Sequence, residues 1–417
     1  MLPKLLLQIH WKSLIVPWQQ VDWLLFAVSA GMTIFGGVII RSAELNQGLT
    51  DWWQHWLVGA IGLALALFIA RCRYENLMQW HWIIYGITNI SLIAVMVTGT
   101  SAKGAQRWIT IGGFNLQPSE FAKLGVIITL AALLHSKTAA TIPSVLRALA
   151  ITAVPWALVF LQPDLGTSLV FGAITLGMLY WGNANLGWLV LLISPVVAAI
   201  LFNVFLPMWF VWTATMSIIA WLTLPWRWFG VLGAAALNFV AGQLGHIFWA
   251  LLKDYQKERL ILVLNPEQDP LGGGYHLIQS RIAIGAGELW GQGLNQGTQT
   301  QLNFVPEQHT DFIFSAIGEE LGFVGALVVL FGFWLICLRL LLIAQNAKDN
   351  FGSLLAIGVL SMLVFQVIIN IGMTIGLAPV TGIPLPLLSY GRSAMLTNFI
   401  AIGIVESVEN YRQRLKF

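Results

Sequence analysis

Charged side chains are scarce in this sequence. Asp, Glu, Lys and Arg make up only 9% of its 417 residues, whereas 58% are hydrophobic. Soluble globular domains carry about a quarter charged residues, so this composition excludes that class. Apolar runs of membrane-spanning length recur along the whole chain, and lipid offers their backbone no hydrogen-bonding partner, so they must be helical. The sequence therefore predicts one all-α, polytopic integral membrane domain.

Cysteine is also rare. The two cysteines, Cys72 and Cys337, exclude a disulfide framework and a cysteine-based metal cluster. The net charge of +3 comes from basic residues that form no stripe, which excludes a nucleic-acid-binding surface. The stretch from Leu5 to Trp18 contains charge and proline and has no small-residue cleavage site, so we predict a short interfacial helix there and no cleavable signal peptide.

Roughly twelve membrane-spanning helices are predicted from the apolar runs. Their approximate ranges are 22 to 40, 55 to 70, 80 to 98, 119 to 135, 145 to 161, 165 to 182, 186 to 206, 209 to 224, 228 to 250, 312 to 343, 352 to 376 and 394 to 408.

Basic residues in short loops set the predicted orientation, because they resist translocation. A cytoplasmic N-terminus keeps the following cations inside: Lys4, Lys12, Arg71, Arg73, Lys137, Arg147, Arg227, Lys348, Arg412, Arg414 and Lys416. Both termini are then cytoplasmic, and the loops at about 99 to 118, 162 to 165, 251 to 311 and 377 to 393 face outward. The large loop 251 to 311 is thus predicted to be extracytoplasmic.

Polar residues gather in these four outward segments. The last one, "PVTGIPLPLLSYGRS" (379 to 393), contains three prolines, so it cannot form an ordinary helix and is predicted to re-enter the membrane region as irregular backbone. Such backbone usually lines a cavity.

In the long loop, the stretch "NPEQDPLGGGYHLIQS" (265 to 280) contains a single aspartate, Asp269, between a glutamine and a proline. The three glycines after Pro270 let the backbone approach a bulky ligand, and a carboxylate near the lipid surface suits a general base or a divalent-cation ligand. An Asp-Pro turn, in which the side chain only caps its own backbone, explains the same letters.

Lys123 is predicted to lie about one turn inside the span that begins at "QPSE", where a charge is costly and needs a partner. Glu120 lies three residues earlier on the same helical face, so the two side chains form a candidate polar cluster for substrate. A structural ion pair between helices is the equal alternative.

Arg107 and Trp108 precede that helix. A guanidinium can pair with phosphate, and a tryptophan can lie against lipid or sugar, but both are also common interfacial anchors. Asp164 in "QPDLGT" is predicted to cap a helix, and Thr310 with Asp311 in "HTDF" is predicted to cap the next span.

Two further groups are polar without a clear chemical signature. Glu319 and Glu320 fall about two turns inside a span, so at least one must face protein or a water-filled cavity. The loop histidines His276 and His309 match no metal-binding spacing and are interpreted as ordinary loop residues.

Six motifs in order go beyond what composition can say. They are "GAQRWI", "QPSEFAKL", "QPDLGTSLV", "NPEQDPLGGGYHLIQSRIAIGAGELWGQG", "FVPEQHTDFIFSAIGEELGFVG" and "TGIPLPLLSYG". This series closely resembles the SEDS family (shape, elongation, division and sporulation) over most of the chain. "DPLGGGYH" and "TGIPLP" resemble its elongation branch more than its division branch.

The resemblance implies a peptidoglycan glycosyltransferase that polymerises lipid II, the undecaprenyl-pyrophosphate-linked disaccharide-peptide, on the outer face of the plasma membrane. Asp269 falls at the family's essential aspartate and is our candidate general base for the acceptor hydroxyl. The reaction inverts the anomeric centre, so one direct displacement suffices. Arg107 and Lys123 are the candidate cations for the leaving pyrophosphate, with Glu120 orienting Lys123, with or without a divalent cation such as Mg²⁺ or Mn²⁺.

The resemblance also implies partners: a class B penicillin-binding protein (a transpeptidase) and the rod-shape machinery of cell elongation. The chain departs from the family at three places. Arg392 in "SYGRS" and Glu288 in "GAGEL" replace usual glycines, which strains the backbone if either position needs a positive φ. The family has ten spans, so the region from about 209 to 250 is interpreted as an inserted helical pair.

Two other function classes are compatible with the sequence. A lipid II flippase or other transporter also needs broken helices and intramembrane charges, although its key charges should lie at the membrane midplane. A non-catalytic scaffold for a transpeptidase would use the long loop as a docking surface.

Overall fold

Helices dominate the computed structural model, which describes residues 21–43, 52–102, 105–111, 114–251, 274–302, 304–305 and 307–412. Their bounds are α2 Trp23–Ala43, α3 Trp52–Ala70, α4 Glu75–Thr98, α5 Pro118–Ser136, α6 Ile142–Leu161, α7 Leu165–Trp181, α8 Leu186–Val204, α9 Leu206–Thr223, α10 Arg227–Leu251, α12 Tyr275–Ala286, α13 Thr298–Gln301, α14 Ile313–Asn346, α15 Asn350–Thr374 and α16 Arg392–Asn410.

Ten of the described helices are long and apolar enough to cross a membrane. They are α2 to α6, α8 to α10, α14 and α15. The apolar α7 has 17 residues, and α16 carries Arg392, Glu406 and Glu409. The polytopic helical membrane fold is therefore confirmed, and the count of about twelve spans stays a prediction.

Three short strands interrupt the helical pattern before α5. β1 Thr100–Ala102, β2 Ala105–Ile111 and β3 Phe114–Leu116 form an antiparallel sheet in the order β1-β2-β3. Ile109 pairs with Leu116, so the sheet delivers the chain directly to Pro118, the first residue of α5. Proline suits that position, where its missing N–H is no loss. The sequence analysis expected a plain polar segment here.

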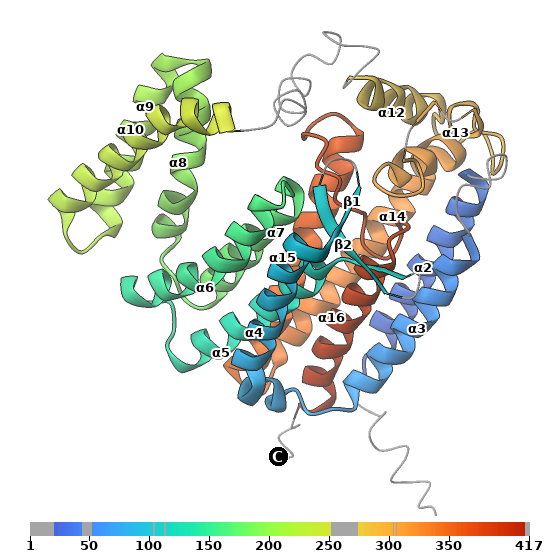
Figure 1. The fold of residues 1–417 in the computed structure, drawn as a ribbon, viewed down its shortest axis with the longest axis horizontal. Helices are drawn as coiled ribbons and strands as arrows, with labels where there is room; N and C mark the ends of the chain where they lie inside the picture. The colour runs from blue at the N-terminus through green and yellow to red at the C-terminus, as the bar shows by residue number, and fades with distance from the viewer. Residues whose placement is uncertain are drawn as a thin grey trace, which may run out of the picture.

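Helices α2 to α7 and α14 to α16 form the main bundle, whose buried core is apolar. The strands, α12, α13 and the start of α5 lie at one end, which we call the hairpin end; α16 runs away from it (Figure 1). Helices α8, α9 and α10 pack mainly on one another and form a separate group beside the bundle (Figure 1). An apolar groove of about 290 Å³ runs between α6, α8 and α10.

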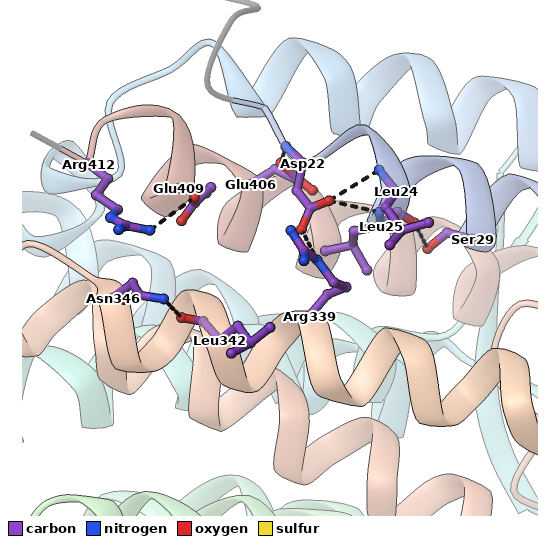
Figure 2. Close-up of polar contacts among 10 residues, drawn as sticks. All are labelled: Asp22, Leu24, Leu25, Ser29, Arg339, Leu342, Asn346, Glu406, Glu409 and Arg412. Atoms are coloured by element: carbon purple, nitrogen blue, oxygen red, sulfur yellow. Dashed lines mark hydrogen bonds and ion pairs between the residues drawn. The ribbon is translucent and has the colours of Figure 1, made fainter. Parts of the chain in front are cut away.

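At the opposite end from the hairpin, a charged cluster ties α2, α14 and α16 together (Figure 2). Asp22 caps α2 by accepting from the backbone N–H groups of Leu24 and Leu25 at 3.1 and 3.2 Å. Its other carboxylate oxygen pairs with Arg339 of α14, and its own N–H donates to Glu406 of α16 at 2.9 Å. The start of the first described helix is thereby held by two helices from the far end of the chain.

The long helix α14 is broken near its start. Gly322 has a φ of 65° and a ψ of −160°, outside the helical region. The break exposes backbone carbonyls, and N–H groups of the loop after α12 donate hydrogen bonds to them. Gln292 N–H donates to Glu319 O and Gly293 N–H to Glu320 O, both at 2.9 Å. A side chain at Gly322 would collide with the backbone of residues 289 and 291, so the close approach requires glycine.

The segment after α15 is irregular and buried, as predicted for 379 to 393. Residues 377–391 contain no helix, yet Leu385, Leu387 and Leu388 are almost fully buried. The side-chain amide of Asn370 donates to the backbone carbonyls of Ile383 and Asp311, both at 2.8 Å, which fixes the segment against the start of α14. The buried carbonyl of Ile383 is thus satisfied by a protein side chain.

Candidate active site

The first turns of α5 carry the Glu120–Lys123 cluster. The ammonium of Lys123 lies 2.8 Å from the Glu120 carboxylate, and the side chains are only 1% and 4% exposed. The predicted contact is confirmed. The burial also means that almost none of the Lys123 surface is open for direct contact with another molecule.

Arg107 contacts the turn between α6 and α7. Its guanidinium donates to the backbone oxygens of Gln162, at 3.3 Å, and of Pro163, and lies 3.8 Å from the carboxylate of Asp164. Asp164 in turn caps α7, accepting from the N–H of Thr167 at 3.2 Å and from its hydroxyl at 3.0 Å. The predicted cap at Asp164 is confirmed, and Arg107 connects that cap to β2.

Trp108 follows Arg107 on β2, so its side chain projects from the opposite face of the strand. Both residues are half-buried. Because Arg107 faces the α6–α7 turn, Trp108 faces away from it. The strand geometry thus separates the two side chains that the sequence analysis grouped as one substrate contact.

Ser393, which the sequence analysis did not single out, joins this site to α16. Its hydroxyl accepts from the N–H of Gln117 at 2.9 Å and donates to the carbonyl of Asn115 at 3.2 Å. These residues immediately precede α5, so Ser393 fixes the start of the helix that carries Lys123. Its place in "SYGRS" marked the segment but gave no sign of this partner.

Glu319 and Glu320 are both fully buried, which confirms that they face protein. Glu319 accepts from the N–H groups of Gln299 and Thr300 at 2.7 and 2.9 Å and so holds α13. Glu320 accepts from the Ser42 hydroxyl at 2.6 Å. The two carboxylates therefore hold the described part of the large loop against α14 and the end of α2.

The predicted cap at Thr310 and Asp311 is wrong. Helix α14 begins after Phe312, without a side-chain capping bond, and the Thr310 hydroxyl instead contacts the carboxylate and carbonyl of Glu307 at 3.1 and 3.2 Å.

The loop histidines contact aromatic rings: His276 stacks on Phe312 at 6.1 Å between ring centroids.

The two replaced glycines behave differently. Glu288 has a φ of 47°, so this position does need the left-handed conformation that glycine favours. Its carbonyl accepts from the N–H of Phe323 at 2.9 Å just beyond the break in α14, which holds the strained residue in place. Arg392 begins α16 and has no positive φ, so the strain expected there is absent.

Asp269 lies outside the described residues, which resume at Gly274. Helix α12 starts at Tyr275, and it is anchored at the hairpin end by Ser280, whose hydroxyl contacts the Ser315 hydroxyl at 2.6 Å and the Thr374 carbonyl at 2.7 Å. The described residues contain no group of three or more His, Cys, Asp or Glu that could hold a metal ion.

Comparison with known proteins gives consistent matches along the chain. The model of a family described as "Cell cycle protein" (FtsW, RodA and SpoVE) matches residues 21–217 and 207–414. The chain is 35% identical over 405 residues to peptidoglycan glycosyltransferase MrdB of Escherichia coli K12, a match that covers 95% of this chain and 96% of that protein.

A second curated relative and a solved structure match equally broadly. Peptidoglycan glycosyltransferase RodA of Treponema pallidum is 34% identical over 428 residues, covering 94% of this chain and 98% of that protein. A chain from a solved structure described as "Structural coordination of polymerization and crosslinking by a peptidoglycan synthase complex" superposes with a TM-score of 0.72 at 29% identity, covering 95% of this chain and 100% of that chain.

Proposed function

Because the chain belongs to the SEDS family of FtsW, RodA and SpoVE proteins, we propose that it is a peptidoglycan glycosyltransferase of the elongation type, which polymerises lipid II and so controls rod shape. The observation that carries this proposal is the match over nearly the whole chain to relatives named as peptidoglycan glycosyltransferases. The buried Glu120–Lys123 pair at the hairpin end supplies the fixed charge that such a reaction needs.

The proposed reaction is a direct displacement. The acceptor sugar hydroxyl attacks the anomeric carbon of the lipid-linked donor, Asp269 takes the hydroxyl proton, and the lipid pyrophosphate leaves. The configuration at the anomeric carbon inverts, because one displacement occurs and no enzyme-bound sugar forms. Ser280 anchors α12, which begins at Tyr275, six residues after Asp269.

Negative charge that develops on the pyrophosphate is stabilised by the field of Lys123 and of the positive end of α5. Glu120 orients Lys123. Arg107 is 28% exposed, so it retains surface for a phosphate oxygen while it binds the α6–α7 turn. Trp108, on the other face of β2, is proposed to lie against sugar or lipid.

The hairpin end is proposed to face outward, with both termini in the cytoplasm. The cations named above support this orientation, since Arg71, Arg73, Lys137 and Lys348 all lie at or beyond helix ends away from the hairpin end. A class B transpeptidase of the rod-shape machinery is the proposed partner. The similarity to a chain of a solved synthase complex that coordinates polymerization and crosslinking supports a partner of that kind.

Helices α9 and α10 are proposed to be the inserted pair. The family model matches in two segments that meet at 207–217, within α9, and α9 and α10 belong to the group beside the bundle. An even number of added helices keeps the next loop on the same side of the membrane.

Polymerisation of lipid II by the purified protein tests the proposal. The wild type should form glycan polymer, and Asp269→Asn should form none. Glu267→Gln, which removes a carboxylate two residues away, should polymerise normally. Equal polymer from wild type and Asp269→Asn would reject the general-base assignment. If the protein moves lipid II across the membrane of reconstituted vesicles and forms no polymer, the proposed enzyme function is wrong and the flippase function takes its place.

A further inference from the structure

The ammonium of Lys123 has more donors than its one carboxylate partner can use. An ammonium carries three N–H donors, and in the described part of the chain the hydrogen bond of Lys123 goes to Glu120. The side chain is only 1% exposed. A buried charged donor without acceptors costs several kcal/mol, so the remaining N–H groups need partners inside the bundle.

Two buried acceptors lie in the same part of the bundle. The side-chain oxygen Oε1 of Gln366 on α15 and the hydroxyl oxygen of Thr397 on α16 have no hydrogen-bond partner among the described residues. Gln366 is 2% exposed and Thr397 is fully buried. An unsatisfied buried oxygen is costly for the same reason as an unsatisfied donor.

The packing of α5 against α15 brings Gln366 to the level of the ion pair. Ile127 of α5 lies against Gly358 of α15, and the two helices run in opposite directions. Lys123 and Glu120 share the face of α5 that carries Ile127. At 1.5 Å per residue, Glu120 lies about 10 Å from Ile127 toward the hairpin end, and Gln366 about 12 Å from Gly358 in the same direction.

The packing of α16 brings Thr397 to the same level. Ser393 contacts Gln117, just before α5, and α16 and α5 run in the same direction. Thr397 is one turn further along the face of α16 that carries Ser393, about 6 Å deeper. That depth corresponds to residues 120 and 121 of α5, where the Lys123 side chain, tilted toward its helix N-terminus, meets Glu120.

We propose that Gln366 and Thr397 are positioning residues that complete the hydrogen bonding of the Lys123 ammonium through bound water. Water fits because it donates to the two side-chain oxygens and accepts from the ammonium. An anion would satisfy the ammonium but would leave both oxygens unpaired. The inference rests on the proposed function, in which Lys123 stabilises charge on the leaving pyrophosphate.

The test uses substitutions that keep size and remove the oxygen: Gln366→Met and Thr397→Val, with Thr397→Ser as the conservative variant. Each of the first two should lower kcat for lipid II polymerisation by about tenfold, with KM changed less than about twofold, because a hydrogen bond to a charged group is lost. Thr397→Ser should restore kcat to near the wild-type value.

Thr129→Val is the matched control. Thr129 is fully buried on α5, but its hydroxyl donates to backbone carbonyls, those of Gly125 at 2.8 Å and of His81 on α4 at 3.4 Å. This variant should keep the wild-type kcat. If the two oxygens were merely unpaired, Gln366→Met and Thr397→Val would keep kcat and unfold at the same or a higher temperature, and that result would overturn the inference.

Lys123→Met distinguishes the proposed role of Lys123 from the proposed roles of Gln366 and Thr397. If it abolishes polymerisation while Gln366→Met and Thr397→Val leave kcat unchanged, the inference is wrong and the role of Lys123 stands. If Lys123→Met itself keeps the wild-type kcat, the proposed role of the cation is wrong, and the positioning role of Gln366 and Thr397 is wrong with it.

Discussion

The buried pair of Glu120 and Lys123 supports a prediction that separates stability from catalysis. Removing one partner of a buried ion pair leaves an uncompensated charge, which typically costs about 3 to 5 kcal/mol. With exposures of 1% and 4%, both side chains belong to that buried class rather than to surface pairs, which contribute about 0 to 1 kcal/mol. Lys123→Met alone should therefore lower the free energy of unfolding by about 3 to 5 kcal/mol.

Replacing both partners should remove that penalty. In Glu120→Leu/Lys123→Met the site is apolar on both sides, and such replacements are often neutral or stabilising. We expect the double variant to unfold within about 1 kcal/mol of the wild type. Its polymerase activity should nevertheless be lost, because the cation near the leaving pyrophosphate is gone.

The assay combines unfolding of the purified protein in detergent with polymerisation of lipid II for wild type, both single variants and the double variant. A single variant that loses less than about 1 kcal/mol would show that the pair is not a buried, coupled one. A double variant that regains polymerisation together with stability would show that Lys123 only holds helices together, and the catalytic assignment would be wrong.

Two other predictions concern the backbone and pH. Glu288→Gly should raise the free energy of unfolding by roughly 0.5 to 1 kcal/mol, because relief of the left-handed conformation outweighs the entropy that glycine loses on folding. Arg392→Gly, at a position without positive φ, should lower the free energy of unfolding. A lower free energy of unfolding in Glu288→Gly would contradict the backbone strain. Burial, with Asp349 3.1 Å away, raises the pKa of the Tyr74 hydroxyl. The folded state therefore holds this proton more tightly than the unfolded state, so stability should fall as pH rises above about 10, and Tyr74→Phe should flatten that fall in an unfolding series against pH.

The helices could be predicted from the sequence because the length of an apolar run and a capping residue are local features. Apolar length placed α5 at about 119 to 135, and the structure has Pro118–Ser136; an acid before "LGT" placed the cap at Asp164. The sheet was missed although "RWITI" is rich in aromatic and β-branched residues, which are the residue types enriched in strands. The prediction for this stretch rested on the side-chain chemistry of Arg107 and Trp108 and not on its strand propensity.

What the sequence did not reveal depends on contacts between distant segments. Ser393 and Gln117 are 276 residues apart, and nothing local to either residue indicates the partner. The break in α14 is similar, since Gly322 is one of 40 glycines, and only the approach of residues 289 to 291 makes it special. The same limit applies to Asp311, where an acid before an apolar run suggested the cap, whereas Phe312 occupies the N-cap position.

The contacts of Asp22 with Arg339 and Glu406 have a consequence for how the chain assembles. Asp22 leaves the ribosome early, but Arg339 and Glu406 are 317 and 384 residues away and follow much later. Helix α2 can insert as soon as it is made, yet Asp22 at its start lacks its cation Arg339 until α14 has entered the membrane, and its acceptor Glu406 until α16 has entered. Completion of the bundle therefore waits for α16, and a chain cut short before α14 would present quality-control proteases with an acidic residue, Asp22, that lacks its cation Arg339.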